Sequence, residues 1–376
     1  MTETTAAPAG PPSPAQPLFI LAMDHRDSFG RTLFGVTGEP TDEQLSAMRA
    51  AKSLIFGAAR RLIGTDLGAG RLGVLVDEQL GADVAREAKA AGFTLAMPVE
   101  ASGADRFRFE YGDDFPAHVE EFNPDWMKVL VRFNPGDPAE LRQAQTQTLR
   151  QLSDWAERSR RHWLFELLVP PTREQLAAHD DQALYDEKQR PELTVEVIRS
   201  LTGAGVHPRI WKLEGYETTA GAQLVLDAVR ETDPASSAIV LGRNAPQRQV
   251  DHWLDVAGPL QGFVGFAIGR SIWDEPIAAH LAGHADADTT QSRIAERYRH
   301  FIRRYLQADV TPAEAADGRG EPFTFTHPRL TPDREVTIRR AVAGADPRGS
   351  RVPAWMVQSL LAEVDALRAD ESDQPA

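Results

Sequence analysis

The chain has 376 residues, 42% of them hydrophobic, with a formal net charge of −14 and no cysteine. Its length permits one large or two medium domains, and its acidity, with no basic stripe, argues against nucleic-acid and anionic-membrane partners. Without cysteine there are no disulfides and no cysteine-ligated zinc. Since there is also no secretion signal and no apolar run near the ~20 residues that span a bilayer, we expect a cytoplasmic protein.

Short apolar runs alternate along the chain with amphipathic stretches of helical spacing. The apolar runs are typical of buried strands: Leu18–Met23, Leu72–Val76, Thr94–Met97, Met127–Arg132, Trp163–Val169, Arg209–Leu213, Ala238–Leu241 and Phe263–Ile268. The stretches predicted to be helices are Asp42–Leu62, Gly81–Ala91, Pro138–Arg160, Pro191–Ala204, Thr219–Glu231 and Gln247–Val256. Strands that alternate with helices predict a parallel sheet with helical crossovers.

The number of strand–helix units decides between two parallel architectures. Eight units are typical of a closed (β/α)8 TIM barrel. The alternative is an open doubly wound sheet, which has fewer strands and a glycine fingerprint that "AMDHRDSFG" lacks. We therefore predict an α/β barrel over residues 18–307, with enlarged loops at 100–123 and 172–190. Residues 1–17 are predicted to be a disordered tail, and 308–376 a C-terminal extension with a helix at 353–367 and a disordered end.

Two lysines lie inside predicted strands. The chain has only five lysines among its 41 basic Lys and Arg residues, so a lysine in an apolar run is unusual. Lys128 lies in the fourth predicted strand and Lys212 in the sixth, within "RIWKLEGY". A buried lysine, unlike arginine, can lose its proton and condense with a carbonyl group. The alternative is a lysine whose ammonium group reaches solvent at the barrel rim.

Acidic residues accompany these lysines. Glu166 lies in the fifth predicted strand, between the two lysine strands, where it could transfer protons during imine formation or be a structural ion-pair partner. Asp24 follows the first strand and could bind or deprotonate a substrate hydroxyl, or cap a helix. The other lysines, Lys52, Lys89 and Lys188, are predicted to be solvated.

Glycine–arginine pairs follow the last two strands. Gly242–Arg243 and Gly269–Arg270 precede predicted helices at the position where barrels commonly bind phosphate, although each pair alone could be an ordinary turn. Further substrate-binding candidates at strand ends are Arg26, Arg132, Asp77 and Glu78. A rival metal-dependent aldolase or isomerase could use Asp24, Asp77, Glu78, Glu100 and Glu214 as ligands. His25 is the only histidine at a strand end, so neither a metal site nor a cofactor is predicted.

The motifs "LAMDHRDSF", "VLVDEQLG", "KVLVRFNP", "FELLVPP", "IWKLEGY", "IVLGRN" and "GFAIGRSIW" also carry a family resemblance. They resemble the aldolase-like domain fused to 5-keto-2-deoxygluconokinase in bacterial inositol catabolism and, more distantly, tagatose-1,6-bisphosphate aldolase. The resemblance implies a class I aldolase barrel without a cofactor. It implies that Lys212 forms the imine, with Glu166, Lys128 and Asp24 as the other catalytic residues. It further implies phosphate binding at the two Gly-Arg pairs.

The same resemblance implies a small phosphorylated sugar as partner. The substrate would be 2-deoxy-5-keto-gluconate 6-phosphate, cleaved to dihydroxyacetone phosphate and malonate semialdehyde, with Arg26 or Arg132 binding the carboxylate. Alternatives are a non-catalytic sugar-phosphate-binding barrel and a barrel whose strand lysines are structural. A homo-oligomer is possible because the predicted C-terminal helix has an apolar face suited to another subunit or to its own barrel.

Overall fold

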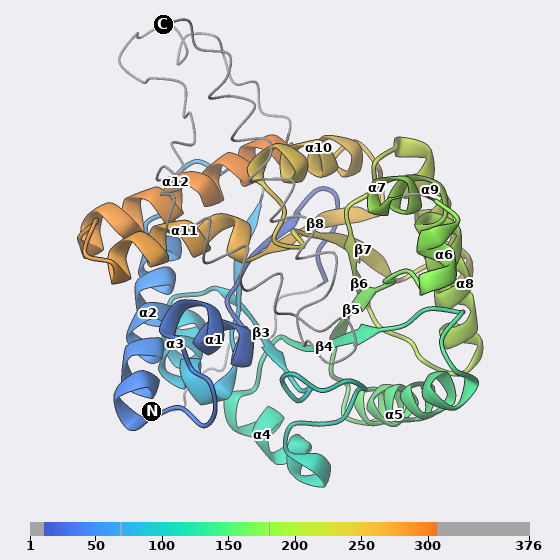
Figure 1. The fold of residues 1–376 in the computed structure, drawn as a ribbon, viewed down its shortest axis with the longest axis horizontal. Coiled ribbons are helices and arrows are strands. Elements are labelled where there is room, and N and C mark those ends of the chain that lie inside the picture. The colour runs from blue at the N-terminus through green and yellow to red at the C-terminus, as the bar shows by residue number, and fades with distance from the viewer. Residues whose placement is uncertain (1–10, 68–69, 180, 307–376) are drawn as a thin grey trace, which may run out of the picture. The chain divides into compact units, whose positions relative to one another are not determined.

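The computed structural model describes residues 11–67, 70–179 and 181–306. Eight parallel strands close into a barrel in sequence order, β1 to β8 (Figure 1), which confirms the predicted (β/α)8 fold. The strands are β1 (Leu18–Ala22), β2 (Arg71–Leu75), β3 (Thr94–Pro98), β4 (Trp126–Arg132), β5 (Trp163–Leu168), β6 (Ile210–Glu214), β7 (Ser237–Leu241) and β8 (Phe263–Ile268). Each lies where an apolar run predicted it.

Helices surround the barrel in Figure 1. The six predicted helices are present as α2 (Asp42–Arg60), α3 (Glu78–Ala90), α5 (Ala139–Arg158), α8 (Arg190–Gly203), α9 (Thr219–Thr232) and α10 (Gln247–Ala257). Local sequence explains where several begin. The Thr41 side chain accepts a hydrogen bond from the backbone of Gln44, whose side chain returns one to Thr41, forming a capping box for α2.

The sequence analysis gave no bounds for the remaining helices, although it predicted one directly after Gly269–Arg270. These are α1 (Asp27–Phe34), α4 (Phe115–Phe122), α6 (Arg173–Ala177), α7 (Gln182–Lys188), α11 (Arg270–Leu281) and α12 (Ala287–Leu306), with a 3₁₀ turn η1 (Gly112–Asp114). The segment 100–123 is therefore partly helical and not an enlarged loop alone. The segment 172–190 holds two short helices. Both are short enough that amphipathic periodicity is weak.

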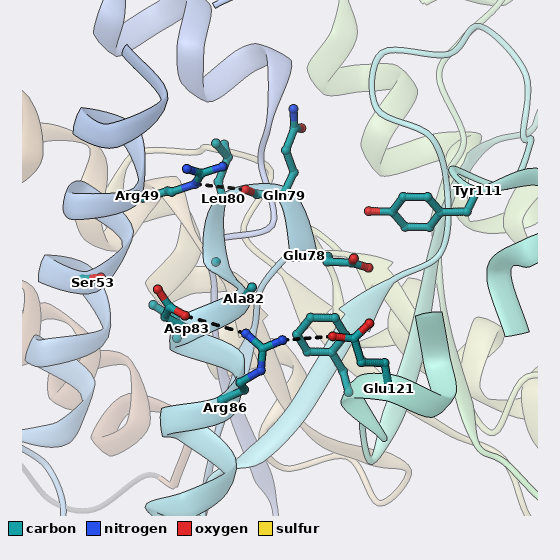
Figure 2. Close-up of a pocket in the computed structure, with 13 residues that line it drawn as sticks. Arg49, Ser53, Glu78, Gln79, Leu80, Ala82, Asp83, Arg86, Tyr111 and Glu121 are labelled. Carbon is teal, nitrogen blue, oxygen red and sulfur yellow. Dashed lines mark hydrogen bonds and ion pairs between the residues drawn. The ribbon is translucent and has the colours of Figure 1, made fainter. Parts of the chain in front are cut away.

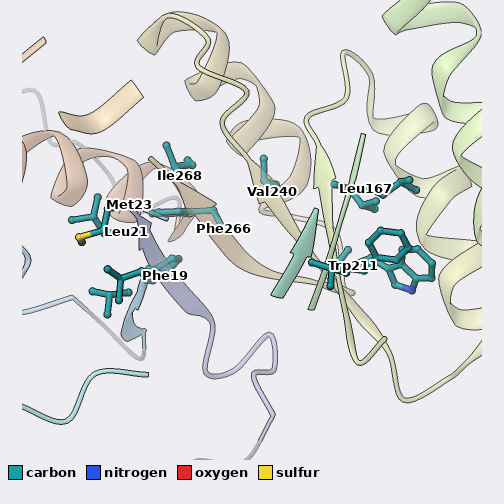
Figure 3. Close-up of a cluster of buried hydrophobic side chains, with 14 of the residues drawn as sticks. Phe19, Leu21, Met23, Leu167, Trp211, Val240, Phe266 and Ile268 are labelled. Atoms are coloured by element: carbon teal, nitrogen blue, oxygen red, sulfur yellow. The ribbon is translucent and has the colours of Figure 1, made fainter. Parts of the chain in front are cut away.

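Side chains on the strands alternate between two apolar layers. One set points into the barrel and includes Leu18, Ile20, Trp126, Leu164, Ile210 and Ile239. The other set points outward to the helices; Figure 3 shows Phe19, Leu21, Trp211 and Phe266 among them. This period of two residues decides which positions near a strand end face the barrel mouth. No helix among residues 11–67, 70–179 and 181–306 is long and apolar enough to cross a membrane.

Residues 11–17 of the predicted disordered tail lie within the described part of the chain. Residues 11–17 include a turn in which Ser13 and Gln16 exchange backbone hydrogen bonds. Pro17 is buried, and its carbonyl oxygen accepts from the Arg71 backbone, which extends the β1–β2 pairing. This part of the predicted tail is thus ordered. Residues 1–10, the extension 308–376 and its predicted helix at 353–367 lie outside the described residues.

Candidate active site

Three charged side chains from adjacent strands meet inside the barrel. Glu166 on β5 lies between two lysines: its Oε1 is 2.8 Å from Nζ of Lys212 on β6, and its Oε2 is 3.0 Å from Nζ of Lys128 on β4. Lys128 and Lys212 are 2% and 4% exposed. The two predicted lysines and the predicted carboxylate therefore form one buried cluster.

Strand register explains how these residues meet. Glu166 is directly paired with Lys212 across β5 and β6, and Lys128 is two positions before Leu130, the β4 partner of Glu166. All three occupy inward-facing positions. Two residues earlier on the same strands lie Trp126, Leu164 and Ile210, which fill the barrel beneath the cluster. The charges thus rest on an apolar floor that excludes water from below.

Two further carboxyl groups contact Lys128. Oδ2 of Asp24, just after β1, is 2.7 Å from Nζ of Lys128, as predicted for a residue of the same site. Oε1 of Glu100, beyond the end of β3, is 2.5 Å from the same nitrogen. An ammonium group has three N–H donors. Those of Lys128 therefore have three carboxyl partners, whereas Lys212 has only Glu166 within ion-pair distance among the described residues.

The electrostatic environment separates the roles of these groups. Burial alone would lower the pKa of Lys128, but Asp24, Glu100 and Glu166 raise that pKa well above its usual value. Burial would raise the pKa of Asp24 and of Glu166, yet the Lys128 ammonium lowers both. Lys128 is therefore a permanent cation beside two ionised carboxylates. It is not suited to attack a carbonyl group, which leaves Lys212 as the candidate nucleophile.

The lysine on α2 is not solvated, contrary to our prediction. Lys52 is 0% exposed and forms an ion pair with Asp77, and its ammonium group lies 5.6 Å from the centre of the Phe29 ring. Asp77 also accepts a hydrogen bond from the backbone of Leu80 and so caps α3. Although Asp77 was a substrate-binding candidate, the structure gives its carboxylate two structural partners.

The predicted substrate-binding residues are dispersed. Arg26 donates to the carbonyl oxygen of Glu100 at 2.6 Å and pairs with Glu110 at 3.0 Å. Arg132 is exposed at the end of β4. Glu78 lies in a separate pocket of about 420 Å³ between α2, α3 and α4, with Tyr111 from the preceding segment (Figure 2). Its carboxylate pairs with His118. Of these three side chains, that of Arg132 alone has no hydrogen bond or ion pair with another described residue, although its carbonyl oxygen accepts a hydrogen bond of 3.0 Å from the Gln145 side chain.

The two glycine–arginine pairs lie after neighbouring strands β7 and β8, as predicted, but their arginines differ. The Arg243 guanidinium pairs with Asp186 at 2.6 Å and with Glu214 at 3.3 Å. Arg270 begins α11 and has no carboxylate within ion-pair distance among the described residues. Burial lowers the pKa of Arg270, and Asp274, Glu166 and Asp24 partly offset this effect through their charges. Arg270 is therefore a cation near the lysine cluster without an ion-pair partner in the described part of the chain.

Gly269 allows the end of β8 to approach β1. A Cβ atom at Gly269 would collide with the carbonyl oxygen of Ala22 and lie 3.1 Å from the ring of His25. The His25 ring packs edge-on against Trp273 at 5.5 Å. Burial lowers the pKa of His25 to about 3, so this ring is neutral at pH 7. The close approach brings the first turn of α11 next to Asp24 and its neighbours.

The fold and the cluster define a (β/α)8 barrel with a buried lysine–carboxylate site inside the barrel. Residues 9–309 match the family described as "Uncharacterized protein conserved in bacteria (DUF2090)", and the chain belongs to this family. No curated protein matches the chain.

Solved structures with a similar fold include a fructose-bisphosphate aldolase from Plasmodium falciparum, crystallised with TRAP and a small-molecule inhibitor. It is 13% identical with a TM-score of 0.53, over 76% of this chain and 89% of that one. An archaeal fructose 1,6-bisphosphate aldolase is 12% identical with a TM-score of 0.48, over 78% of this chain and 94% of the other. At 13% identity the likeness to the Plasmodium falciparum enzyme establishes the barrel fold alone.

Proposed function

We propose that this chain is an aldehyde-lyase, a Schiff-base aldolase that cleaves a phosphorylated keto-sugar to dihydroxyacetone phosphate and an aldehyde. The observation that carries the proposal is the position of Glu166 between Lys212 and Lys128, at 2.8 and 3.0 Å, in a buried site. A carboxylate shared by a fixed cation and a second lysine can exchange protons with that second lysine. The similarity of fold to the fructose-bisphosphate aldolase from Plasmodium falciparum is consistent with this function.

Imine formation is the first step of the proposed reaction. Glu166 takes a proton from the Lys212 ammonium, and the free amine attacks the ketone carbon. A C–N bond forms, the C=O π bond opens, and one proton moves from the attacking nitrogen to the former carbonyl oxygen to give the carbinolamine. Glu166 then returns the proton to the carbinolamine hydroxyl, which leaves as water and gives the protonated imine. Lys128 remains a cation throughout and keeps Glu166 ionised between proton transfers.

Carbon–carbon cleavage follows from the imine. Asp24 removes the proton from the hydroxyl on the second carbon from the imine carbon. The bond between that second carbon and the first carbon next to the imine breaks as an aldehyde forms. The electron pair moves into the protonated imine and gives an enamine. Reprotonation on carbon and hydrolysis release dihydroxyacetone phosphate and restore Lys212. Asp24 fits this role because it lies 2.7 Å from Lys128, across the barrel from Lys212.

The phosphate group binds beside the two last strands in this proposal. Arg270 supplies the charge because it has no ion-pair partner in the described part of the chain, while the Gly242–Arg243 turn and the first turn of α11 supply backbone N–H groups. The Arg243 guanidinium stays with Asp186 and Glu214 and positions the α7 segment. Within this class, 2-deoxy-5-keto-gluconate 6-phosphate is the candidate substrate implied by the sequence motifs, with malonate semialdehyde as the aldehyde.

Borohydride trapping tests the proposal. Borohydride reduces a protonated imine to a stable secondary amine, so incubation with dihydroxyacetone phosphate should raise the intact mass by one ligand per chain. Lys212→Met should abolish the label, and Lys188→Met, which removes a lysine 59% exposed on α7, should not. Ligand binding without any label would contradict the aldolase and fit a non-catalytic sugar-phosphate-binding barrel. Loss of turnover on treatment with EDTA would instead indicate a metal-dependent enzyme.

A further inference from the structure

His25, next to Asp24 in the loop after β1, has no role in the reaction described so far. Its Nδ1 is buried, has no hydrogen-bond partner, and lies 3.9 Å from Oδ1 of Asp24. Its other ring nitrogen, Nε2, also has no hydrogen-bond partner among the described residues, but it is not buried, and the side chain is 24% exposed. A ligand in the site can therefore reach Nε2, whereas Nδ1 is closed to it.

The loop after β1 and the start of α11 hold the His25 ring between them. The indole Nε1 of Trp273 on α11 donates a hydrogen bond of 2.8 Å to the carbonyl oxygen of Ala22, and the ring of His25 packs edge-on against the same indole, with 5.5 Å between ring centres. A Cβ atom at Gly269 would lie 3.1 Å from Cε1 of His25. The ring is thus fixed at the β1–β8 junction, beside Arg270 in the first turn of α11.

The charges around His25 keep its ring neutral. The pKa of His25 is lowered to about 3, first by burial and then by the positive charges of Arg270 and Lys212. The negative charges of Asp24 and Glu166 oppose this only in part. A neutral imidazole has one N–H donor and one acceptor nitrogen. Because the Asp24 carboxylate lies near Nδ1, it favours the proton on Nδ1 and leaves Nε2 as an acceptor.

The residues around the ring indicate which part of a substrate it meets. In the proposed reaction the keto carbon is bound to Lys212, the phosphate lies at Arg270, and Asp24 takes the proton from the hydroxyl on the second carbon. The hydroxyl on the first carbon next to the keto group is the neighbour of that second hydroxyl. His25 adjoins Asp24 along the chain and Arg270 across the β1–β8 junction, so its accessible Nε2 is suited to the first hydroxyl.

We propose that His25 is a further substrate-contacting residue, whose Nε2 accepts a hydrogen bond from the hydroxyl on the carbon next to the keto group. The proposal rests on the proposed aldolase function for the position of the keto group. It defines the ligands of the site as α-hydroxyketone phosphates such as dihydroxyacetone phosphate. Methyl ketone phosphates such as hydroxyacetone phosphate lack this hydroxyl and leave Nε2 without a donor.

Two ligands that differ only in this hydroxyl test the contact by isothermal titration calorimetry. Wild type should bind dihydroxyacetone phosphate roughly tenfold more tightly than hydroxyacetone phosphate. His25→Leu should lose most of this preference by weakening the first ligand alone, whereas His25→Gln should retain it because the amide oxygen still accepts. His162→Leu, which changes a histidine before β5 at the other end of the barrel, is the control and should bind both ligands as wild type does.

The pattern of losses separates a contact from a structural role. If His25 only supported the fold, His25→Leu would weaken both ligands equally, and that result would overturn the proposal. Nitrogen NMR of the free protein tests the ring without the leucine variant. The ¹⁵N signals that disappear in His25→Gln should show a neutral ring with its proton on Nδ1 at pH 7. A proton on Nε2, or on both nitrogens, would overturn the role of Nε2 as an acceptor.

Borohydride trapping separates this proposal from the aldolase function. If wild type prefers dihydroxyacetone phosphate but forms no label, the aldolase function fails and the His25 contact remains as part of a binding site. If wild type forms the label and His25→Leu keeps the preference, the contact fails and the aldolase function remains. Wild type that binds neither ligand would overturn both.

Discussion

Two buried lysine–carboxylate groups lie in this barrel, and they differ in how completely their partners are satisfied. Lys52 and Asp77 form a closed pair: one ammonium, one carboxylate, a capping bond to Leu80, and exposed fractions of 0% and 1%. The cluster of Lys128, Glu166 and Lys212 is an open chain. Among the described residues, Lys128 has three carboxyl partners there, Lys212 has one, and one oxygen of Glu100 has none.

The difference shows that burial of a lysine does not by itself indicate catalysis. A pair in which each charge has one partner stabilises the fold locally and leaves nothing to react. In the larger cluster, three carboxyl groups keep Lys128 as a fixed cation. Lys212 has Glu166 alone among the described residues as a carboxyl group with which it can exchange a proton. The four predictions below test this contrast, from the largest expected effect to the smallest.

Glu166→Gln should remove proton transfer from the cluster of Lys128, Glu166 and Lys212. The amide keeps the shape of the side chain but cannot accept and return a proton, so kcat should fall by roughly 10²–10⁴-fold. Label from borohydride and dihydroxyacetone phosphate should still form, only more slowly, because Lys212 remains. Turnover within a few-fold of wild type would show that Glu166 is only a structural partner.

Lys52→Met should remove the ion pair between Lys52 and Asp77 and lower the stability of the fold. Removal of one partner leaves the Asp77 carboxylate buried and unpaired, so the free energy of unfolding should drop by about 3–5 kcal/mol. Chemical denaturation measures this loss. The added change Asp77→Asn should restore part of it, because asparagine still caps α3 without a charge. Folded Lys52→Met protein should keep the borohydride label; a protein that folds normally but loses the label would contradict the assignment of Lys52 to structure.

Arg270→Gln tests whether Arg270, which has no ion-pair partner among the described residues, binds the phosphate, in contrast to the paired Arg243. Loss of a charged hydrogen-bond donor to phosphate should raise KM for a phosphorylated ketose by roughly 10–100-fold, with kcat less affected. Arg243→Gln is the matched control. It should mainly lower stability, because its guanidinium is already bound to Asp186 and Glu214. A larger KM effect in Arg243→Gln would reverse the assignment of the phosphate ligand.

Protonation of His25, which lies at the edge of the site, should make the free energy of unfolding depend on pH. Burial lowers the pKa of His25 in the folded protein from 6.5 to about 3. Its neutral form therefore stabilises the fold fully above pH 6.5, and this contribution declines as pH falls toward 3 because the unfolded chain binds the proton first. Between pH 7 and pH 5, wild type should lose up to about 2 kcal/mol more stability than His25→Gln. Urea denaturation measures the free energy of unfolding of both proteins. Equal losses in wild type and in His25→Gln between pH 7 and pH 5 would contradict this prediction.

The sequence predicted the barrel well because parallel strands buried on both faces are continuous apolar runs. The same property made Lys128, Glu166 and Lys212 conspicuous, since each interrupts such a run, and strand order then placed them on neighbours. Glu100 could not be assigned in this way. Its contact with Lys128 depends on the turn after β3, whose shape is set by backbone bonds such as that from Ala101 to Arg108.

Lys52 carried a signal that our sequence analysis did not use. It lies four residues after Met48 and three before Ile55, both buried, so helical spacing places it on the core face of α2. The partner of Arg243 was harder to foresee. Asp186 lies on the short helix α7 within an insertion, and nothing in the local pattern indicates where that helix packs.

The site of the borohydride label tests the central claim most directly. Wild-type protein reduced in the presence of dihydroxyacetone phosphate is digested, and the modified lysine is identified by mass spectrometry of its peptides. The account predicts a single modified residue, Lys212, with Lys128 and Lys52 unmodified. Label on Lys128 or Lys52, or protein that turns over substrate without any lysine label, would contradict it.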